Sequence, residues 1–173
     1  SATANEIIEV TQEELSRASL QKTPQEVLAV FVQPSYDLNP EVIKSSLCLA
    51  LDDVQDPGNL GTIIRLADWF GIEHIFCSTG TADVYNPKTV QATMGALARV
   101  KVHYCSLPQL IESLTDIPVY GTFLNGNIIY TESLSAHGLI VMGNEGKGVS
   151  LEVEKLINNK LYIPNYPQER ETS

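Results

Sequence analysis

Apolar runs alternate with stretches of helical periodicity over residues 46–164. The apolar runs are short and are bounded by turn-forming residues, which is typical of buried strands: 47–54, 72–77, 100–104, 118–123, 139–142 and 161–163. The helical patterns lie between these runs: 60–70, 87–97, 107–114 and 150–157. Strands that alternate with helices pair in parallel, so the sequence predicts an α/β domain with a mostly parallel sheet and helices on both faces.

Turn-forming residues separate these elements. The first strand ends in Asp56-Pro-Gly-Asn59, and we expect Asn59 to cap the helix that follows and Gly71 to end it. A second turn is expected at Asn125-Gly-Asn127, between the run at 118–123 and the short apolar run at 128–130.

The first 45 residues have a different character. They contain an acidic helical pattern at 10–20, a polar turn at Gln21–Pro24 and an apolar run at 27–32. We interpret them as a separate remnant with a linker, outside the α/β domain.

Composition and charge narrow the class of protein. No apolar run approaches the roughly 20 residues that span a bilayer, and residues 1–9 lack the pattern of a secretory signal, so we expect a cytoplasmic protein that does not enter a membrane. The three cysteines and three histidines show no metal-ligand spacing, so no metal site is predicted. A net charge of −10 argues against nucleic-acid binding by the chain as a whole.

Two glycine-containing turns follow predicted strands, at 56–61 and 143–148. Turns of this kind at the carboxyl ends of parallel strands commonly hold ligands, although they also serve as plain connections. An ordinary nucleotide-binding α/β enzyme is one alternative. Neither turn fits GxGxxG or GxxxxGK[ST], so the sequence lacks the phosphate-binding motifs of that class of enzyme.

Short motifs occur in a fixed order along the α/β domain. They are Asp56-x-x-Asn59-x-Gly61-x-x-x-Arg65 with Ala67 and Gly71, then Gly95-Ala96, then Gly143-x-Glu145-Gly146-x-Gly148, then Ile163-Pro164. This series resembles the motifs of the SpoU/TrmH class of RNA 2′-O-ribose methyltransferases in the SPOUT superfamily. The resemblance covers roughly residues 46–164.

The resemblance implies a fold and an activity. The fold would be a SPOUT-type parallel α/β sheet with its C-terminal segment threaded as a trefoil knot, a departure from the rule that chains do not thread loops. The activity would be methyl transfer from S-adenosylmethionine to a ribose 2′-hydroxyl of tRNA or rRNA. It also implies a homodimer in which residues from both subunits approach the RNA.

By position, Asn59, Arg65 and Glu145 match the family's catalytic residues. Arg65 would help to deprotonate the ribose hydroxyl, but a guanidinium normally stays protonated, so we favour substrate alignment and electrostatic stabilisation for it. Structural alternatives remain for all three. Arg65 could pair with an acid such as Asp68, Asn59 could be a simple helix cap, and Glu145 could stabilise the start of the following helix.

The donor site implied by the resemblance consists of loop residues near strand ends. Main-chain groups there suit the adenine edge and the amino-acid tail of the donor. The expected donor-binding residues are Thr122, Gly143, Asn144, Gly146, Gly148, Ile163 and Pro164.

The resemblance also sets the expected domains. Residues 1–45 would be a remnant of an N-terminal substrate domain with its linker, and residues 22–32 are similar to the segment that joins the two domains in the family. Residues 46–173 would be the methyltransferase domain without its last motif, because Tyr166–Ser173 lacks the family's Ser-Leu-Asn core. The knot would then be incomplete, and the alternative function is a catalytically silent RNA-binding or dimerisation module.

Overall fold

The computed structural model describes residues 5–21 and 23–164, and the chain divides into two compact units at Ser35 and Tyr36. In the first unit, α1 (Gln12–Ala18) lies within the predicted helical segment at 10–20. The N–H of Glu14 donates to the Thr11 hydroxyl, and the Glu14 carboxylate accepts from the Thr11 N–H at 2.8 Å, which forms a capping box. The domain boundary expected at residue 45 stays a prediction.

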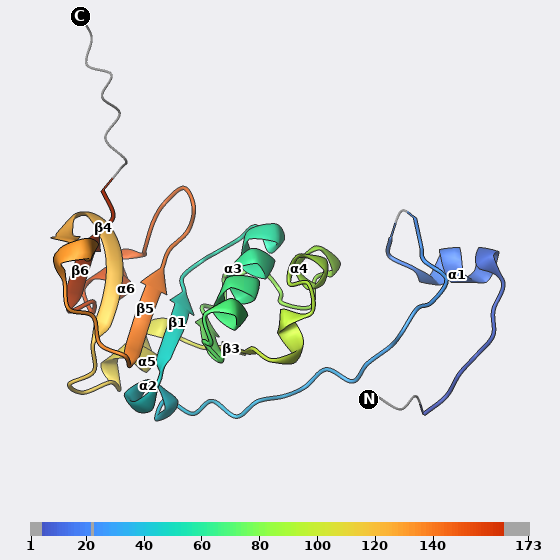
Figure 1. The fold of residues 1–173 in the computed structure, drawn as a ribbon, viewed down its shortest axis with the longest axis horizontal. Coiled ribbons are helices and arrows are strands. Elements are labelled where there is room, and N and C mark those ends of the chain that lie inside the picture. Colours follow the sequence, from blue (N-terminus) through green and yellow to red (C-terminus); the bar gives the residue numbers. More distant parts are fainter. Residues whose placement is uncertain (1–4, 22, 165–173) are drawn as a thin grey trace, which may run out of the picture. The chain divides into compact units, whose positions relative to one another are not determined.

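The second unit is built on a six-stranded parallel sheet in the order β3-β2-β1-β5-β4-β6 (Figure 1). Its elements, in chain order, are α2 (Val42–Ser45), β1 (Leu47–Leu51), α3 (Pro57–Trp69), β2 (His74–Cys77), α4 (Pro87–Ala92), η1 (Ala96–Ala98), β3 (Lys101–Tyr104), α5 (Leu107–Glu112), β4 (Val119–Ile128), η2 (Ile129–Thr131), β5 (Gly138–Met142), α6 (Leu151–Glu154) and β6 (Asn159–Tyr162). All six predicted strands are therefore present.

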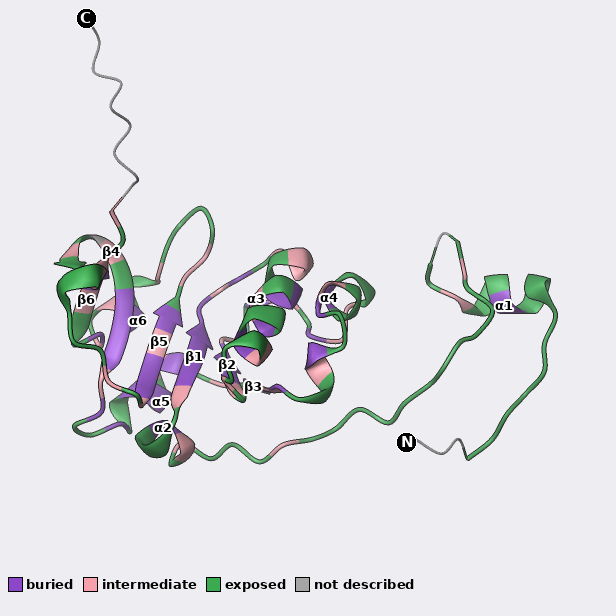
Figure 2. Ribbon diagram, viewed as in Figure 1, coloured by how far each residue is buried: buried purple, intermediate pink, exposed green. Residues whose placement is uncertain are grey.

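Helices cover both faces of the sheet, and the central strands are buried (Figure 2). Alternate residues of β1 face opposite cores, because side chains along a strand point to opposite sides. Cys48 and Ala50 pack with α2, α5 and α6, whereas Leu49 and Leu51 pack with α3 and η1. The predicted α/β class, with a parallel sheet between two helical layers, is confirmed, and the trefoil knot stays a prediction.

The helix after β1 begins three residues earlier than the sequence pattern indicated. Asp56 is its N-cap, since the Asp56 carboxylate accepts from the Asn59 N–H at 2.8 Å, so the assignment of Asn59 as the cap was wrong. Pro57 explains the difference, because proline suits the first position of a helix. Gly71 follows the helix at a φ of 72°, as expected for a glycine that ends one.

Two other local expectations were wrong. The helix expected at 87–97 stops at Ala92, because Met94 and Gly95 both adopt positive φ, and a short 3-10 turn follows. The turn expected at 125–127 lies inside β4, where the pairing with β6 shifts register between Thr122 and Asn127. Because of this shift in register, β4 can continue through Asn125-Gly-Asn127 although these residue types favour a turn.

Gly61 holds α3 and α4 in close contact. A Cβ atom at this position would lie 2.5 Å from the Cβ of Ala92 and 2.6 Å from the carbonyl oxygen of Thr89. Because backbone is involved, the two helices would have to separate to admit a side chain. The glycine in this motif is explained by helix packing.

We expect Gly61→Ala to destabilise the protein by about 1–3 kcal/mol, through overpacking against α4. Helix propensity alone predicts the opposite, a stabilisation of about 1 kcal/mol. Urea unfolding followed by circular dichroism measures the change, with Thr62→Ala at the exposed neighbouring position as control. A Gly61→Ala protein as stable as its parent would contradict the packing argument.

Candidate functional site

The two glycine-containing turns meet at the carboxyl ends of β1 and β5. These strands pair directly, with Leu51 beside Met142, so the segments that follow them start at adjacent points. The chain runs from β1 toward β2 and β3 on one side, while β5, β4 and β6 lie on the other. Such a switch point in strand order is where open parallel sheets bind ligands.

The loop after β5 is closed on itself. The backbones of Asn144 and Gly148 exchange two hydrogen bonds of 2.9 Å, and the Asn144 side-chain oxygen accepts from the N–H groups of Gly146 and Lys147. Gly143 passes so close to Gly148 that a Cβ atom on it would lie 2.2 Å from the Gly148 carbonyl carbon. The loop can adopt this shape only with glycine at position 143.

Asn59 and Glu145 are in contact although they are 86 residues apart in the chain. The Asn59 amide donates to the Glu145 carboxylate at 2.9 Å, and both side chains are exposed. This hydrogen bond, and more weakly the N–H of Glu145 itself, holds the pKa of the Glu145 carboxyl below its ordinary value. Glu145 does not lie at a helix start, because α6 begins only at Leu151, so that alternative was wrong.

Arg65 lies on the exposed side of α3. Its expected structural partner, Asp68, instead forms a two-bonded pair with Arg99 at 2.6 and 2.8 Å. Within the part of the chain that the structure describes, Arg65 has no ion pair or side-chain hydrogen bond. Its guanidinium is therefore available to a ligand.

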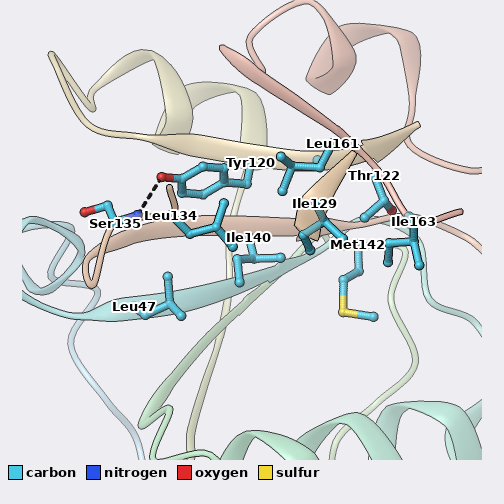
Figure 3. Close-up of a pocket in the computed structure, with 12 residues that line it drawn as sticks. Leu47, Tyr120, Thr122, Ile129, Leu134, Ser135, Ile140, Met142, Leu161 and Ile163 are labelled. Carbon is cyan, nitrogen blue, oxygen red and sulfur yellow. Dashed lines mark hydrogen bonds between the residues drawn. The ribbon is translucent and has the colours of Figure 1, made fainter. Parts of the chain in front are cut away.

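A cavity of 360 Å³ lies beside the loop after β5. Side chains from β1, β4, β5 and β6 surround it, on the sheet face that also carries α3 (Figure 3). The lining is mainly apolar, and the Ser135 N–H donates to the Tyr120 hydroxyl at 3.0 Å on one side. The lining residues are Leu47, Tyr120, Gly121, Thr122, Ile129, Leu134, Ser135, Ile140, Met142, Gly143, Leu161 and Ile163.

The cavity contains some of the predicted donor residues but not all. Thr122, Gly143 and Ile163 line it. Asn144, Gly146 and Gly148 shape the adjoining loop without lining the cavity, and Pro164 does not line it. The sequence did not predict the lining residues that lie in strands, because an apolar side chain in a strand is expected to be part of the core. The available signal was the alternation along β5, which places every second side chain on the face of the sheet that carries the cavity.

Residues 5–21 and 23–164 contain neither a candidate metal site nor a helix that could span a membrane. No group of three or more His, Cys, Asp or Glu side chains could hold a metal ion there. Within the same residues, no helix has both the length and the apolar character needed to cross a bilayer.

Residues 46–170 match the SpoU rRNA methylase family. This match covers well over half of the chain. The chain belongs to the SpoU family. The family that the order of motifs suggested is thereby confirmed.

Named relatives of this SpoU chain methylate ribosomal RNA. It is 33% identical over 162 residues to the 23S rRNA (guanosine(2553)-2'-O)-methyltransferase RlmP of Bacillus subtilis (strain 168), covering 92% of this chain and 64% of that protein. It is 29% identical over 153 residues to the 23S rRNA (uridine(2479)-2'-O)-methyltransferase of Streptomyces viridochromogenes, covering 83% and 53%. The chain thus spans less than two thirds of these relatives.

Solved structures of SpoU/TrmH proteins share the fold. A TrmH-family protein from Porphyromonas gingivalis superposes with a TM-score of 0.79 at 39% identity, over 97% of this chain and 68% of that one. The AdoMet-bound rRNA methyltransferase from Sinorhizobium meliloti gives a TM-score of 0.79 at 29% identity, over 94% and 64%. The SPOUT-type architecture predicted for the SpoU domain is therefore confirmed.

We expect Asn59→Ala to raise the pKa of the Glu145 carboxyl toward its ordinary value, because the amide that stabilises the ionised form is lost. A ¹³C NMR titration of that carboxyl measures the shift. Asn39→Ala, which removes a distant amide, is the control and should leave the titration of Glu145 unchanged. Identical curves for Asn59→Ala and the parent would show that the contact is absent in solution.

Proposed function

We propose that this chain is the methyltransferase part of an enzyme that transfers a methyl group from S-adenosylmethionine to a ribose 2′-hydroxyl of RNA, with ribosomal RNA as the favoured substrate. The observation that carries this proposal is the position of the Asn59–Glu145 pair and the cavity beside one closed glycine loop at the β1–β5 switch point. Two relatives are named as 23S rRNA methyltransferases, which supports the choice of substrate. A cytoplasmic location, where ribosomes are assembled, is part of the proposal.

The cavity suits S-adenosylmethionine. A volume of 360 Å³ lies in the range of small-molecule sites, about 300–1,000 Å³. Ile140 and Leu161 offer apolar surface for a flat ring, while Gly143 leaves main-chain groups accessible for its polar edge. When bound, the donor supplies an electrophilic methyl group on a sulfonium. Two solved relatives are AdoMet-bound, which supports this assignment.

The polar residues outside the cavity, Asn59, Arg65 and Glu145, would bind and align the RNA. The Glu145 carboxylate, whose pKa is lowered by the Asn59 amide, accepts from that amide and can hold it in a fixed orientation. Arg65 has all of its N–H donors available among the described residues. Because a guanidinium keeps its proton, we assign Arg65 the tasks of holding a phosphate and aligning the ribose hydroxyl.

We also propose that two copies of the chain associate through the exposed face of α3. Leu66, Trp69 and Phe70 follow one another at helical spacing on this face, and Trp69 is 83% exposed. Large apolar side chains gathered on one helix face are typical of an interaction surface. Arg65 lies one turn before Trp69, so a second copy on this face would lie close to Arg65.

Methyl transfer tests the proposed activity. In the full-length protein that contains this chain, we expect transfer of radiolabelled methyl to ribosomal RNA from cells that lack the gene. Arg65→Ala should lower kcat/KM by about 100-fold or more while donor affinity changes little, because electrostatic alignment acts on the transition state. Arg65→Lys should restore little, since lysine lacks the paired donors.

Arg99→Ala, which removes an arginine already paired with Asp68, is the matched control and should keep parental activity. A parent protein that neither binds the donor nor methylates RNA would overturn the proposed function. Parental activity in Arg65→Ala would overturn only the role of this residue.

Association tests the proposed dimer. We expect Trp69→Glu to convert a dimer into a monomer, because a carboxylate placed at an apolar contact must be desolvated. Sedimentation velocity measures the change. Leu151→Glu, on α6 at the other face of the sheet, is the control and should stay dimeric. A monomeric parent, or a dimeric Trp69→Glu protein, would rule out this interface.

A further inference from the structure

Asp52 is a buried carboxylate directly after β1, and none of the four family motifs includes it. Asp52 is only 6% exposed to solvent. The Asp52 N–H donates to the carbonyl oxygen of Met142 at 2.8 Å, and its side-chain oxygen accepts from the N–H of Ser150 at 2.8 Å. Met142 and Ser150 stand immediately before and after residues 143–149, so Asp52 contacts both ends of that loop.

The neighbouring residue fixes Asp52 in place. Asp53 adopts a φ of 60°, a conformation that few residues other than glycine accept. Its N–H donates to the Ser78 hydroxyl at 2.9 Å, and its carbonyl oxygen accepts from the Asn144 side chain at 2.8 Å. The turn after β1 is therefore held by the residue that follows β2 and by the 143–149 loop.

The loop held by Asp52 carries both parts of the proposed site. Gly143 at its start lines the cavity, and Glu145 binds Asn59. Hydrogen bonds from main-chain N–H groups to a buried carboxylate are among the stronger ones in proteins, because the acceptor is charged. Loss of this acceptor would also leave the Ser150 N–H without its partner.

We propose that Asp52 is a positioning residue, which acts through the 143–149 loop to keep the cavity and the Asn59–Glu145 pair in their binding arrangement. This inference rests on the proposed function and adds a residue to it. A loop held in its binding shape before the donor arrives loses little conformational freedom on binding. Asp52 would thus raise donor affinity without touching the donor.

The experiment compares two substitutions in the full-length protein that contains this chain. Asp52→Ala removes the acceptor, whereas Asp52→Asn keeps an oxygen of the same size for the Ser150 N–H. We expect Asp52→Ala to weaken S-adenosylmethionine binding by about tenfold or more in calorimetry. Amide hydrogen exchange should speed up at residues 144–150 and stay unchanged in β2 and β3. Asp52→Asn should recover most of both properties.

Asp83→Ala provides the matched control, because the Asp83 carboxylate also accepts a main-chain N–H, from Tyr85 at 2.9 Å, away from the loop. It should bind the donor as the parent does. Parental affinity and loop protection in Asp52→Ala would overturn the inference. Faster exchange throughout the sheet in Asp52→Ala, or an Asp52→Asn protein as impaired as Asp52→Ala, would overturn it too.

Failure of this inference is distinct from failure of the proposed function. If the parent protein does not bind S-adenosylmethionine, the proposed function fails, and hydrogen exchange at residues 144–150 still measures whether Asp52 positions the 143–149 loop. If the parent binds the donor and Asp52→Ala binds it equally well, only the role of Asp52 is lost.

Discussion

The parallel pairing of β1 with β5 is the contact on which the rest of the structure depends. Five consecutive residues of each strand are in register, from Leu47 beside Gly138 to Leu51 beside Met142. Both strands lie at the centre of the sheet and bury side chains on both faces. Because paired parallel strands end at the same edge, this register alone determines which two loops can meet.

The loops at that edge show how a site can be assembled from weak, exposed contacts on a rigid base. The Asn59–Glu145 hydrogen bond joins two exposed side chains, and such contacts contribute little by themselves. The positions of these two side chains are set by the segments that carry them. The turn after β1 and the loop after β5 are joined by main-chain and buried side-chain hydrogen bonds. The exposed groups can then serve a substrate without having to hold the fold.

The sequence pattern was sufficient for the fold class and for the loops that form the site, and less so for local details. The apolar run at 47–51 and the Gly143–Gly148 turn are recognisable because burial and backbone freedom restrict residue type. The choice between Asp56 and Asn59 as the cap depended on Pro57, since both side chains can cap. Strand order and the cavity could not be predicted, because they depend on contacts between residues far apart in the chain.

The all-parallel arrangement also has a consequence for how the chain is made. No two neighbouring strands are joined by a hairpin, so the pairing of Leu47 with Gly138 waits until about 90 further residues have left the ribosome, roughly 5–20 s at ordinary rates of synthesis. During that interval the edge of β1 that later pairs with β5 has unpaired main-chain N–H and C=O groups. The site at the carboxyl ends of β1 and β5 therefore forms only after most of the domain has been synthesised.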